Sequence, residues 1–268
     1  MTQRHVNRLI CFLVWLRFSI TDRLWLWWSR LTWRDGPLVT VYIPTYNRAD
    51  LLMSRALPSV LAQTYRELDV VVVDDCSTDD TVARVRALGD PRVRVLSTGV
   101  RGRRYPPTAD NHWLAGPVVA ANTALADVRG AYVARIDDDD EWSPWHIQTA
   151  LSVLRSSGAE FVSSAYRVIT PAGERVVAER PISGTQTWVY RAGLAGMRYN
   201  LHCWRKTSER VNDLDLADRM LRAGVRTVYF SGVMATVRAR PGETAVGAAV
   251  YRENAERYER FYAPDPSA

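Results

Sequence analysis

Short runs of β-branched residues alternate with helical segments from residue 38 onward, and this alternation restricts the fold more than any other feature of the chain. Strands are predicted at 38–43, 68–73, 93–97 and 131–136, with a hairpin formed by 161–169 and 176–177. Helices are predicted at 51–65, 77–88, 117–128, 145–157 and 212–223, and a long loop at 99–117. This order is typical of an α/β protein with a mostly parallel sheet and helices on both faces.

The length and composition allow one large domain with appended segments. The 268 residues can bury a sizeable core, and no period of roughly 20 to 50 residues recurs, which argues against solenoids and propellers. Three cysteines without CxxC spacing exclude a disulfide scaffold or a cysteine zinc site. We therefore predict a helical segment at 1–37, a main domain at 38–240 and a C-terminal helix and tail at 241–268.

Aspartates directly follow two of the predicted strands. Asp74 and Asp75 end the second strand, and four aspartates at 137–140 end the strand at 131–136. Ligands of such sheets bind beyond the carboxyl ends of the strands. Clustered carboxylates repel one another unless a cation offsets them, and oxygen donors suit Mg²⁺ or Mn²⁺. The sequence therefore predicts a divalent metal site at 137–140 that binds a diphosphate, in preference to a solvated acidic turn.

Other polar groups give weaker signals. Asp213 lies in the first turn of the helix at 212–223, where a carboxylate is favourable with or without a ligand. The four histidines show no ligand or catalytic spacing, and we assign them no role. The chain has no GxxxxGKS/T segment and no GxGxxG after a strand, so the common glycine-rich phosphate loops are absent.

Six segments in order resemble family 2 glycosyltransferases of the GT-A (Rossmann-like) fold. They are VTVYIPTYNR (39–48), SVLAQTY (59–65), VVVDDCSTDDT (71–81), GPVVAANTAL (116–125), GAYVARIDDDDEWSP (130–144) and NDLDLADRMLRAGV (212–225). The resemblance implies a metal-dependent, inverting transfer of a sugar from a nucleotide-diphosphate sugar to an acceptor hydroxyl. No QxxRW segment follows, which favours single addition in glycan or cell-envelope polysaccharide synthesis.

The resemblance also assigns nucleotide contacts to this chain. By position, Pro44 and Tyr46 at the end of the first strand would contact the nucleotide. Asp75 would hydrogen-bond the base, with Asp74 beside it.

The remaining roles implied by the resemblance concern the metal, the sugar and the acceptor. Asp137 and Asp139 take the first and last positions of the DxD pattern, with Asp139 as the main metal ligand. Asp138 would face the ribose or the sugar. Asp213 takes the position of the general base, which accepts the acceptor proton as that oxygen attacks the anomeric carbon.

Two departures from the family pattern support an alternative function. Asn212 stands where the family often has Glu, and Ala120-Ala121-Asn122 lacks the Arg of an ARN segment. The alternative is a non-catalytic relative that binds a nucleotide sugar and acts as a partner or regulatory protein. A nucleotidyltransferase is disfavoured, because its GxGxR loop would stand where this chain reads IPTYNR.

Residues 1–37 concentrate arginine and tryptophan, with six Arg, two Asp and five of the ten Trp. The apolar run at 9–20 is about 18 Å long as a helix, short of the roughly 30 Å hydrocarbon core of a bilayer. No A-x-A-like cleavage site follows it. We predict a helix at the membrane interface, against the alternative of packing on the body or on a second copy.

The predicted location and binding partners follow from these assignments. Nucleotide sugars are available in the cytoplasm, so we predict a peripheral protein at the cytoplasmic face of the membrane. Its acceptor would be a glycan, a lipid-linked glycan or another hydroxyl compound, and nothing outside 1–37 favours nucleic acid. Residues 182–204 either shape the acceptor side or serve as core and hairpin packing, and the sequence leaves both open.

Overall fold

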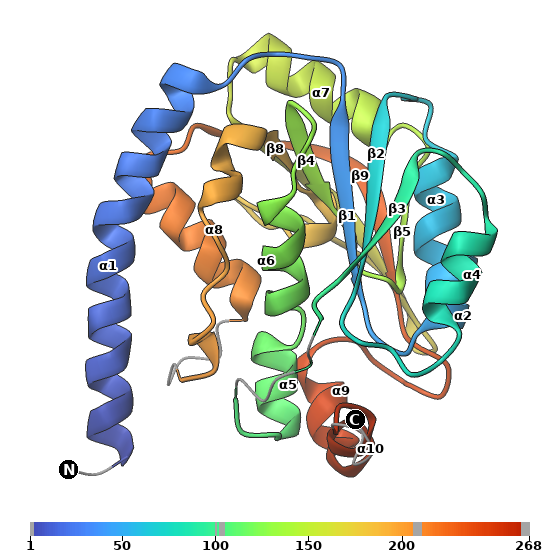
Figure 1. Cartoon of the computed structure of the whole chain (residues 1–268). Coiled ribbons are helices and arrows are strands. Elements are labelled where there is room, and N and C mark those ends of the chain that lie inside the picture. The colour runs from blue at the N-terminus through green and yellow to red at the C-terminus, as the bar shows by residue number, and fades with distance from the viewer. Residues whose placement is uncertain (1–2, 100, 102–104, 206–210, 264–268) are drawn as a thin grey trace.

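The computed structural model describes residues 3–99, 101, 105–205 and 211–263. Within them one mixed sheet has the strand order β3-β2-β1-β4-β8-β6-β9-β5, with β7 paired to β6 (Figure 1). The strands are β1 (Val39–Thr45), β2 (Leu68–Asp74), β3 (Val93–Ser97), β4 (Tyr132–Arg135), β5 (Asp140–Trp142), β6 (Phe161–Thr170), β7 (Gly173–Val177), β8 (Val189–Arg191) and β9 (Thr227–Arg238).

The helices lie on both faces of this sheet. They are α1 (Gln3–Thr32), α2 (Ala49–Leu51), α3 (Leu57–Leu61), α4 (Thr81–Ala87), α5 (Ala109–Ala115), α6 (Val118–Ala126), α7 (His146–Ser157), α8 (Asn212–Ala223), α9 (Ala248–Glu253) and α10 (Ala255–Phe261). The predicted α/β sheet with helices on both faces and an N-terminal helix is confirmed.

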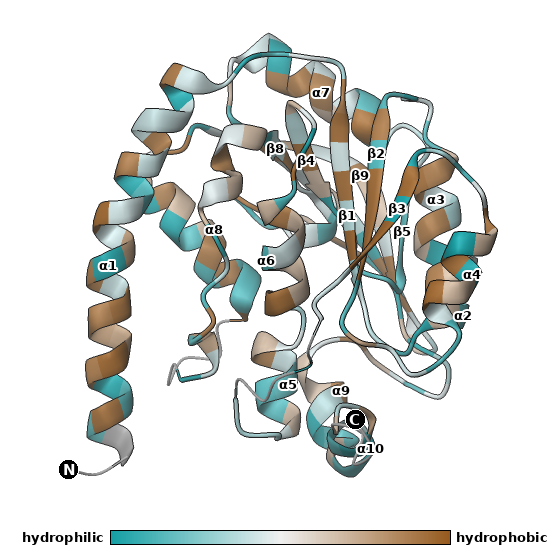
Figure 2. Ribbon diagram, in the orientation of Figure 1, coloured by the Kyte–Doolittle hydropathy of each residue, from teal (hydrophilic) through white to brown (hydrophobic). Residues whose placement is uncertain are grey.

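Burial on both faces explains why the strands read as continuous apolar runs. In β2, Val71 and Val73 pack on the face that carries α6 and α8, whereas Val70 and Val72 pack on the face that carries α3 and α7. The alternation follows from the two-residue period of a strand. Burying each of these valine side chains stabilises the folded state by roughly 1.5–3 kcal/mol. Because both faces of the strand are buried, apolar residues are favoured at successive positions. Figure 2 shows these strands as hydrophobic along their length.

Beyond β4 the strands no longer all run in the same direction. β1 pairs in parallel with β2 and β4, and β2 with β3, whereas β8 runs antiparallel to both β4 and β6. β5 adds a second antiparallel edge against β9. Both β5 and β8 are three residues long, too short for a periodic pattern, so they are visible only in the tertiary structure.

Two local predictions are corrected by the structure. The segment 99–117 is not one loop, because α5 forms within it and begins where the Thr108 side chain accepts a hydrogen bond from the Asn111 N–H. This short helix packs against α9 and α10, a contact between segments far apart in sequence. The predicted helix at 51–65 is a composite of α2, a π-helical turn (Leu52–Ala56) and α3, and Pro58 is the second residue of α3, directly after the π-helical turn.

The second half of α1 packs on the body of the protein. Leu26 is buried, Trp25 Nε1 donates to the Gly193 carbonyl at 2.6 Å, and Arg30 binds Glu160 at 2.8 Å. Glu160 directly precedes β6 and is 2% exposed. The packing predicted as the alternative for residues 1–37 is therefore present on one side of this helix.

The other side of α1 has no partner in the described part of the chain. Its large apolar side chains remain 43–62% exposed, with Leu24 at 62% and Trp27 at 61%. Figure 2 shows hydrophobic residues along much of the helix, which stands at one margin of the molecule. No helix in the described ranges combines the length and the apolar character needed to cross a bilayer.

Candidate active site

A cavity of about 150 Å³ opens at the carboxyl ends of β1 and β4 and at the start of α8. Its walls include every predicted site residue except Asp74, namely Pro44, Tyr46, Asp75, Asp137, Asp138, Asp139 and Asp213. Parallel pairing of β1 with β2 and β4 aligns the ends of these strands, which is why groups from separate sequence segments meet here.

Aromatic and acidic groups line the end of the cavity beyond β1 and β2. The Tyr46 ring lies against the Arg101 guanidinium, whose Cζ is 3.1 Å from the ring centroid, and stacks on Tyr262 of the C-terminal segment. Asp75 accepts a hydrogen bond from the Thr98 hydroxyl at 2.8 Å. Asp74 is buried and accepts from the Ser77 N–H at 3.1 Å, so it stabilises the turn behind the cavity wall.

Asp137 is held by a buried arginine. Arg135 donates from Nη2 and Nε to the same Asp137 oxygen, at 2.8 and 3.1 Å, and from Nη1 to the Tyr199 hydroxyl at 2.9 Å. The Arg135 side chain is 3% exposed, whereas that of Asp137 is 37% exposed. The arginine therefore orients Asp137 while leaving part of its carboxylate open to a ligand.

Asp138 and Asp139 are both paired with arginines. Asp138 accepts from the Thr45 hydroxyl at 2.9 Å and from Arg48 Nη1 at 3.0 Å. Asp139 accepts from Arg240 Nε at 2.5 Å. Burial raises the pKa of Asp138 despite Arg48, whereas Arg240 and Arg48 outweigh burial at Asp139 and lower its pKa. Asp139 is therefore firmly ionised.

The donor chemistry of this end of the cavity suits a hard divalent cation. Asp137 and Asp139 line the same cavity and offer only oxygen atoms. In the described ranges no three His, Cys, Asp or Glu side chains converge into a ready-made cluster, and the Arg240 guanidinium lies on Asp139. A cation bound by Asp139 and Asp137 would therefore take the place of Arg240 at the Asp139 carboxylate.

Asp213 faces the cavity from the first turn of α8. Burial raises its pKa, and the neighbouring Arg135 limits that rise. One of its oxygens accepts the Leu214 N–H at 2.8 Å, which fixes the side chain at the helix start. A positioned carboxylate with a raised pKa is a better proton acceptor than an exposed one.

The residues at the two departures from the family pattern are buried or hydrogen-bonded to other elements. Asn212 is buried and donates from Nδ2 to the Leu114 carbonyl at 3.1 Å, which ties α8 to α5. Asn122 donates to the Tyr199 carbonyl at 3.0 Å and accepts the Tyr199 N–H at 2.9 Å. Ala121 lies fully buried in the core. Trp188 and Tyr199 are buried as well, so much of 182–204 is packing.

The sequence pattern did not single out four cavity residues, namely Arg48, Arg135, Arg240 and Tyr262. Arg48 and Arg135 lie within the matched segments at 39–48 and 130–144, so attention to cations near the aspartates would have found them. Arg240 and Tyr262 come from the C-terminal segment, where no periodic or motif signal marks them.

Comparison with known proteins identifies the family of these segments. The model of "Glycosyl transferase family 2" matches residues 40–104 and 110–215. A putative colanic acid biosynthesis glycosyl transferase of Escherichia coli is 33% identical over 135 residues, which is 50% of this chain and 42% of that protein. The UDP-Glc:alpha-D-GlcNAc-diphosphoundecaprenol beta-1,3-glucosyltransferase WfgD of Escherichia coli is 30% identical over 50% of this chain and 48% of its own length. The chain thus spans less than half of these curated relatives.

Solved structures confirm the predicted GT-A fold. Staphylococcus aureus TarS 1–349 in complex with UDP-GlcNAc superposes with a TM-score of 0.61 at 19% identity, over 84% of this chain and 70% of that one. The mannosyltransferase PcManGT of Pyrobaculum calidifontis, in complex with GDP-Man and Mn²⁺, gives a TM-score of 0.55 at 22% identity, over 87% and 67%.

Proposed function

Because this chain belongs to glycosyl transferase family 2, we propose that it transfers a sugar from a nucleotide-diphosphate sugar to an acceptor hydroxyl, with inversion and by single addition, in polysaccharide synthesis. The observation that carries the proposal is the shared cavity of Asp137, Asp139 and Asp213. In this proposal residues 38–240 form the catalytic domain, 1–37 the anchor segment, and 241–268 the C-terminal helices and tail.

The donor binds along the cavity from Tyr46 to the DxD aspartates. Pro44 and Tyr46 contact the nucleotide, Asp75 hydrogen-bonds the base with Asp74 behind it, and Asp138 faces the ribose or sugar. Arg48 and Arg240 line the same cavity, where their charges stabilise a diphosphate. Mg²⁺ or Mn²⁺ held by Asp139 and Asp137 would neutralise the charge that develops on the departing diphosphate.

The transfer step places Asp213 on the acceptor side. Its carboxylate accepts the proton of the acceptor hydroxyl while that oxygen forms a bond to the anomeric carbon. The bond from this carbon to the diphosphate oxygen breaks, and the nucleoside diphosphate leaves with the electron pair. Attack from the side opposite the leaving group inverts the configuration.

A UDP-sugar donor and a lipid-linked acceptor are the substrate classes we propose. WfgD is named for a UDP-Glc donor and a diphosphoundecaprenol-linked acceptor, and TarS was solved with UDP-GlcNAc. These observations support the assignment by similarity to the relatives.

Nucleotide release tests the proposed donor chemistry. We expect the purified chain to release UDP from one UDP-sugar with Mn²⁺ or Mg²⁺ and to lose that release in EDTA, because the diphosphate needs a cation to leave. The panel contains UDP-, GDP- and dTDP-sugars, each with and without membrane extract as the acceptor source. Donor binding without release under every condition would favour the alternative, a non-catalytic nucleotide-sugar-binding protein.

We further propose that the exposed side of α1 contacts the cytoplasmic face of a membrane. Its apolar side chains and its arginines suit an interface of acyl chains and anionic headgroups. The Arg30–Glu160 ion pair fixes the C-terminal end of α1 to the body of the protein. Contact of α1 with the membrane would therefore hold the catalytic domain near a lipid-linked acceptor.

Vesicle sedimentation tests this contact. The double variant Leu24→Ser/Trp27→Ser should bind anionic vesicles at least about tenfold more weakly than the original chain, because two exposed apolar anchors are lost. Val176→Ser removes a 55% exposed apolar residue from β7 and serves as the control, with binding expected to stay unchanged. Equal sedimentation of all three proteins would refute the contact.

A further inference from the structure

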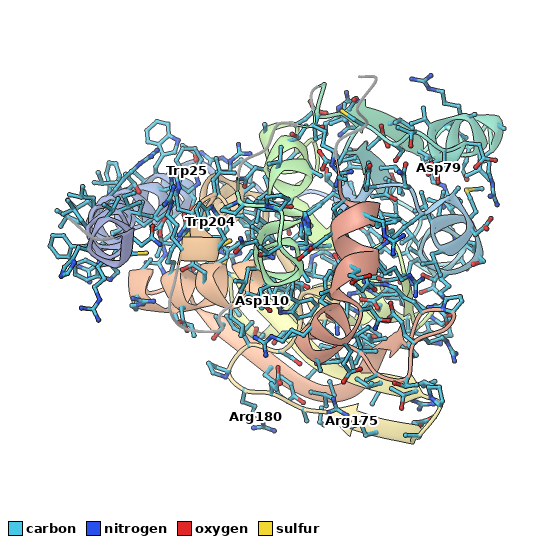
Figure 3. The ribbon with its side chains drawn as sticks, turned by 90° about the horizontal axis from the view of Figure 1, so that it is seen from below. Trp25, Asp79, Asp110, Arg175, Arg180 and Trp204 are labelled. Atoms are coloured by element: carbon cyan, nitrogen blue, oxygen red, sulfur yellow. The ribbon has the colours of Figure 1, made fainter. Side chains whose placement is uncertain are left out.

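A second cavity, of about 440 Å³, lies between α1 and α8 and shares no lining residue with the donor cavity. Its α1 wall is mainly apolar and includes Phe12, Val14, Trp15 and Phe18. Figure 3, seen from below, shows α1 along one side of the molecule, with Trp25 and Trp204 on that same side. We call this cavity the α1–α8 groove.

The opposite wall of the α1–α8 groove contains basic residues and one carboxylate, that of Asp215. Arg219 and Arg222 of α8 line it, together with His202. Arg222 is 55% exposed and reaches solvent, whereas Arg219 is 7% exposed and lies over the Phe18 ring at 3.7 Å. Arg219 pairs with Asp22 and Arg222 with Asp218, so an anion in the groove would share these arginines with the carboxylates. One wall thus suits a hydrocarbon chain, and the other offers two arginines to an anion.

Arg219 has hydrogen-bonding capacity left within the described structure. Its Nε donates to Asp22 at 3.0 Å and its Nη2 to the Arg198 carbonyl at 2.7 Å. Its buried Nη1 has no hydrogen-bond partner among the described residues and lies 3.8 Å from a carboxylate oxygen of Asp215. Buried donors normally have a partner, so an anionic ligand in the groove would satisfy this one.

The groove lies close to the site of proton transfer. Asp215 lines the groove and Asp213 lines the donor cavity, and both belong to the first turn of α8. Because they are two residues apart, the side chains of Asp213 and Asp215 point to opposite sides of α8, and this helix, about 10–12 Å across, separates the groove from the donor cavity. A sugar carried by a lipid phosphate in the groove would reach Asp213 by passing the N-terminal end of α8.

The groove is also continuous with the exposed side of α1. Phe12 and Trp15 line it and are themselves 56% and 50% exposed. A hydrocarbon chain that leaves the groove thus meets further apolar surface.

We propose that the α1–α8 groove binds a lipid phosphate, with the hydrocarbon chain against α1 and the phosphate at Arg219 and Arg222. The proposal rests on the proposed transferase function in that this lipid would carry the acceptor hydroxyl. The groove then determines acceptor class, whereas the donor cavity determines the sugar.

Calorimetric titration of the full chain tests the groove without any turnover. The probes are farnesyl monophosphate below its aggregation concentration, farnesol and inorganic phosphate. Farnesyl monophosphate should bind more tightly than either other probe, because only it uses both walls, and added salt should weaken it. No binding of farnesyl monophosphate, or equal binding of farnesol, would overturn the proposal.

Two adjacent substitutions distinguish the groove from the outer surface of α1. Val14→Trp fills the groove and should weaken farnesyl monophosphate binding by about tenfold or more. Leu13→Trp adds the same side chain at a 53% exposed position outside the groove and should leave binding unchanged. Equal weakening in both variants would place the lipid on the outer surface and overturn the groove.

A variant that changes the charge of the groove keeps the proposal testable even if Val14→Trp does not fold. Arg222→Gln, at an exposed position, should weaken the binding of farnesyl monophosphate several-fold and leave the binding of farnesol unaffected. Unchanged binding of both probes would overturn the assignment of the phosphate to this arginine. UDP-sugar binding and UDP release are measured on the same proteins. In the original chain, intact farnesyl monophosphate binding without any UDP release would count against the proposed transferase, whereas UDP release without farnesyl monophosphate binding would count against the groove.

Discussion

Replacement of Asp213 by asparagine is expected to lower the rate of sugar transfer by about 10²- to 10⁴-fold, the usual contribution of a general base. Asparagine keeps the shape of the side chain and its contact with the Leu214 N–H, but it cannot accept the acceptor proton. Donor affinity should remain unchanged, since the nucleotide lies at the other end of the cavity. Transfer rates and donor titrations on the same protein measure both effects.

A matched variant on the same helix isolates this effect. Asp218→Asn removes a carboxylate of α8 that lies outside the donor cavity, and transfer should continue at nearly the original rate. Because burial raises the pKa of Asp213, transfer should fall on acidification at a pH above the ordinary aspartate range. Full transfer by Asp213→Asn would mean that another group accepts the proton.

The second large effect is expected from Asp139→Asn. Loss of this carboxylate should slow nucleotide release by about two to three orders of magnitude, because cation stabilisation of a leaving diphosphate is worth several kcal/mol. Mn²⁺ binding, followed by electron paramagnetic resonance, should weaken in parallel. Arg240 loses its 2.5 Å charged partner, so a lower melting temperature is expected as well.

Asp140→Asn provides the control for Asp139→Asn. Asp140 is buried at the start of β5 and does not belong to the lining of the donor cavity. Its replacement should leave Mn²⁺ binding and nucleotide release close to those of the original chain. Unchanged Mn²⁺ binding by Asp139→Asn would instead assign the Asp139–Arg240 pair a purely structural role.

The C-terminal segment shows why the candidate site was only partly predictable. Arg240 follows β9 and contacts Asp139, in the middle of the chain. Tyr262 follows α10 and contacts Arg48, near the start of the chain. Neither residue lies in a periodic segment or a motif. Their position depends on how α9 and α10 pack against α5, which is a contact between elements far apart in sequence.

Patterns along the chain were enough to predict the parallel half of the sheet, the aspartates beyond β2 and β4, and Asp213 at the start of α8. These features are local: a strand buried on both faces needs a continuous apolar run, and ligand groups follow it directly. Other features became visible only in the folded molecule, namely the antiparallel strands β5 and β8, the arginines paired with Asp138 and Asp139, and the α1–α8 groove. Each of these arises from packing between distant segments, and such contacts leave no regular pattern along the chain.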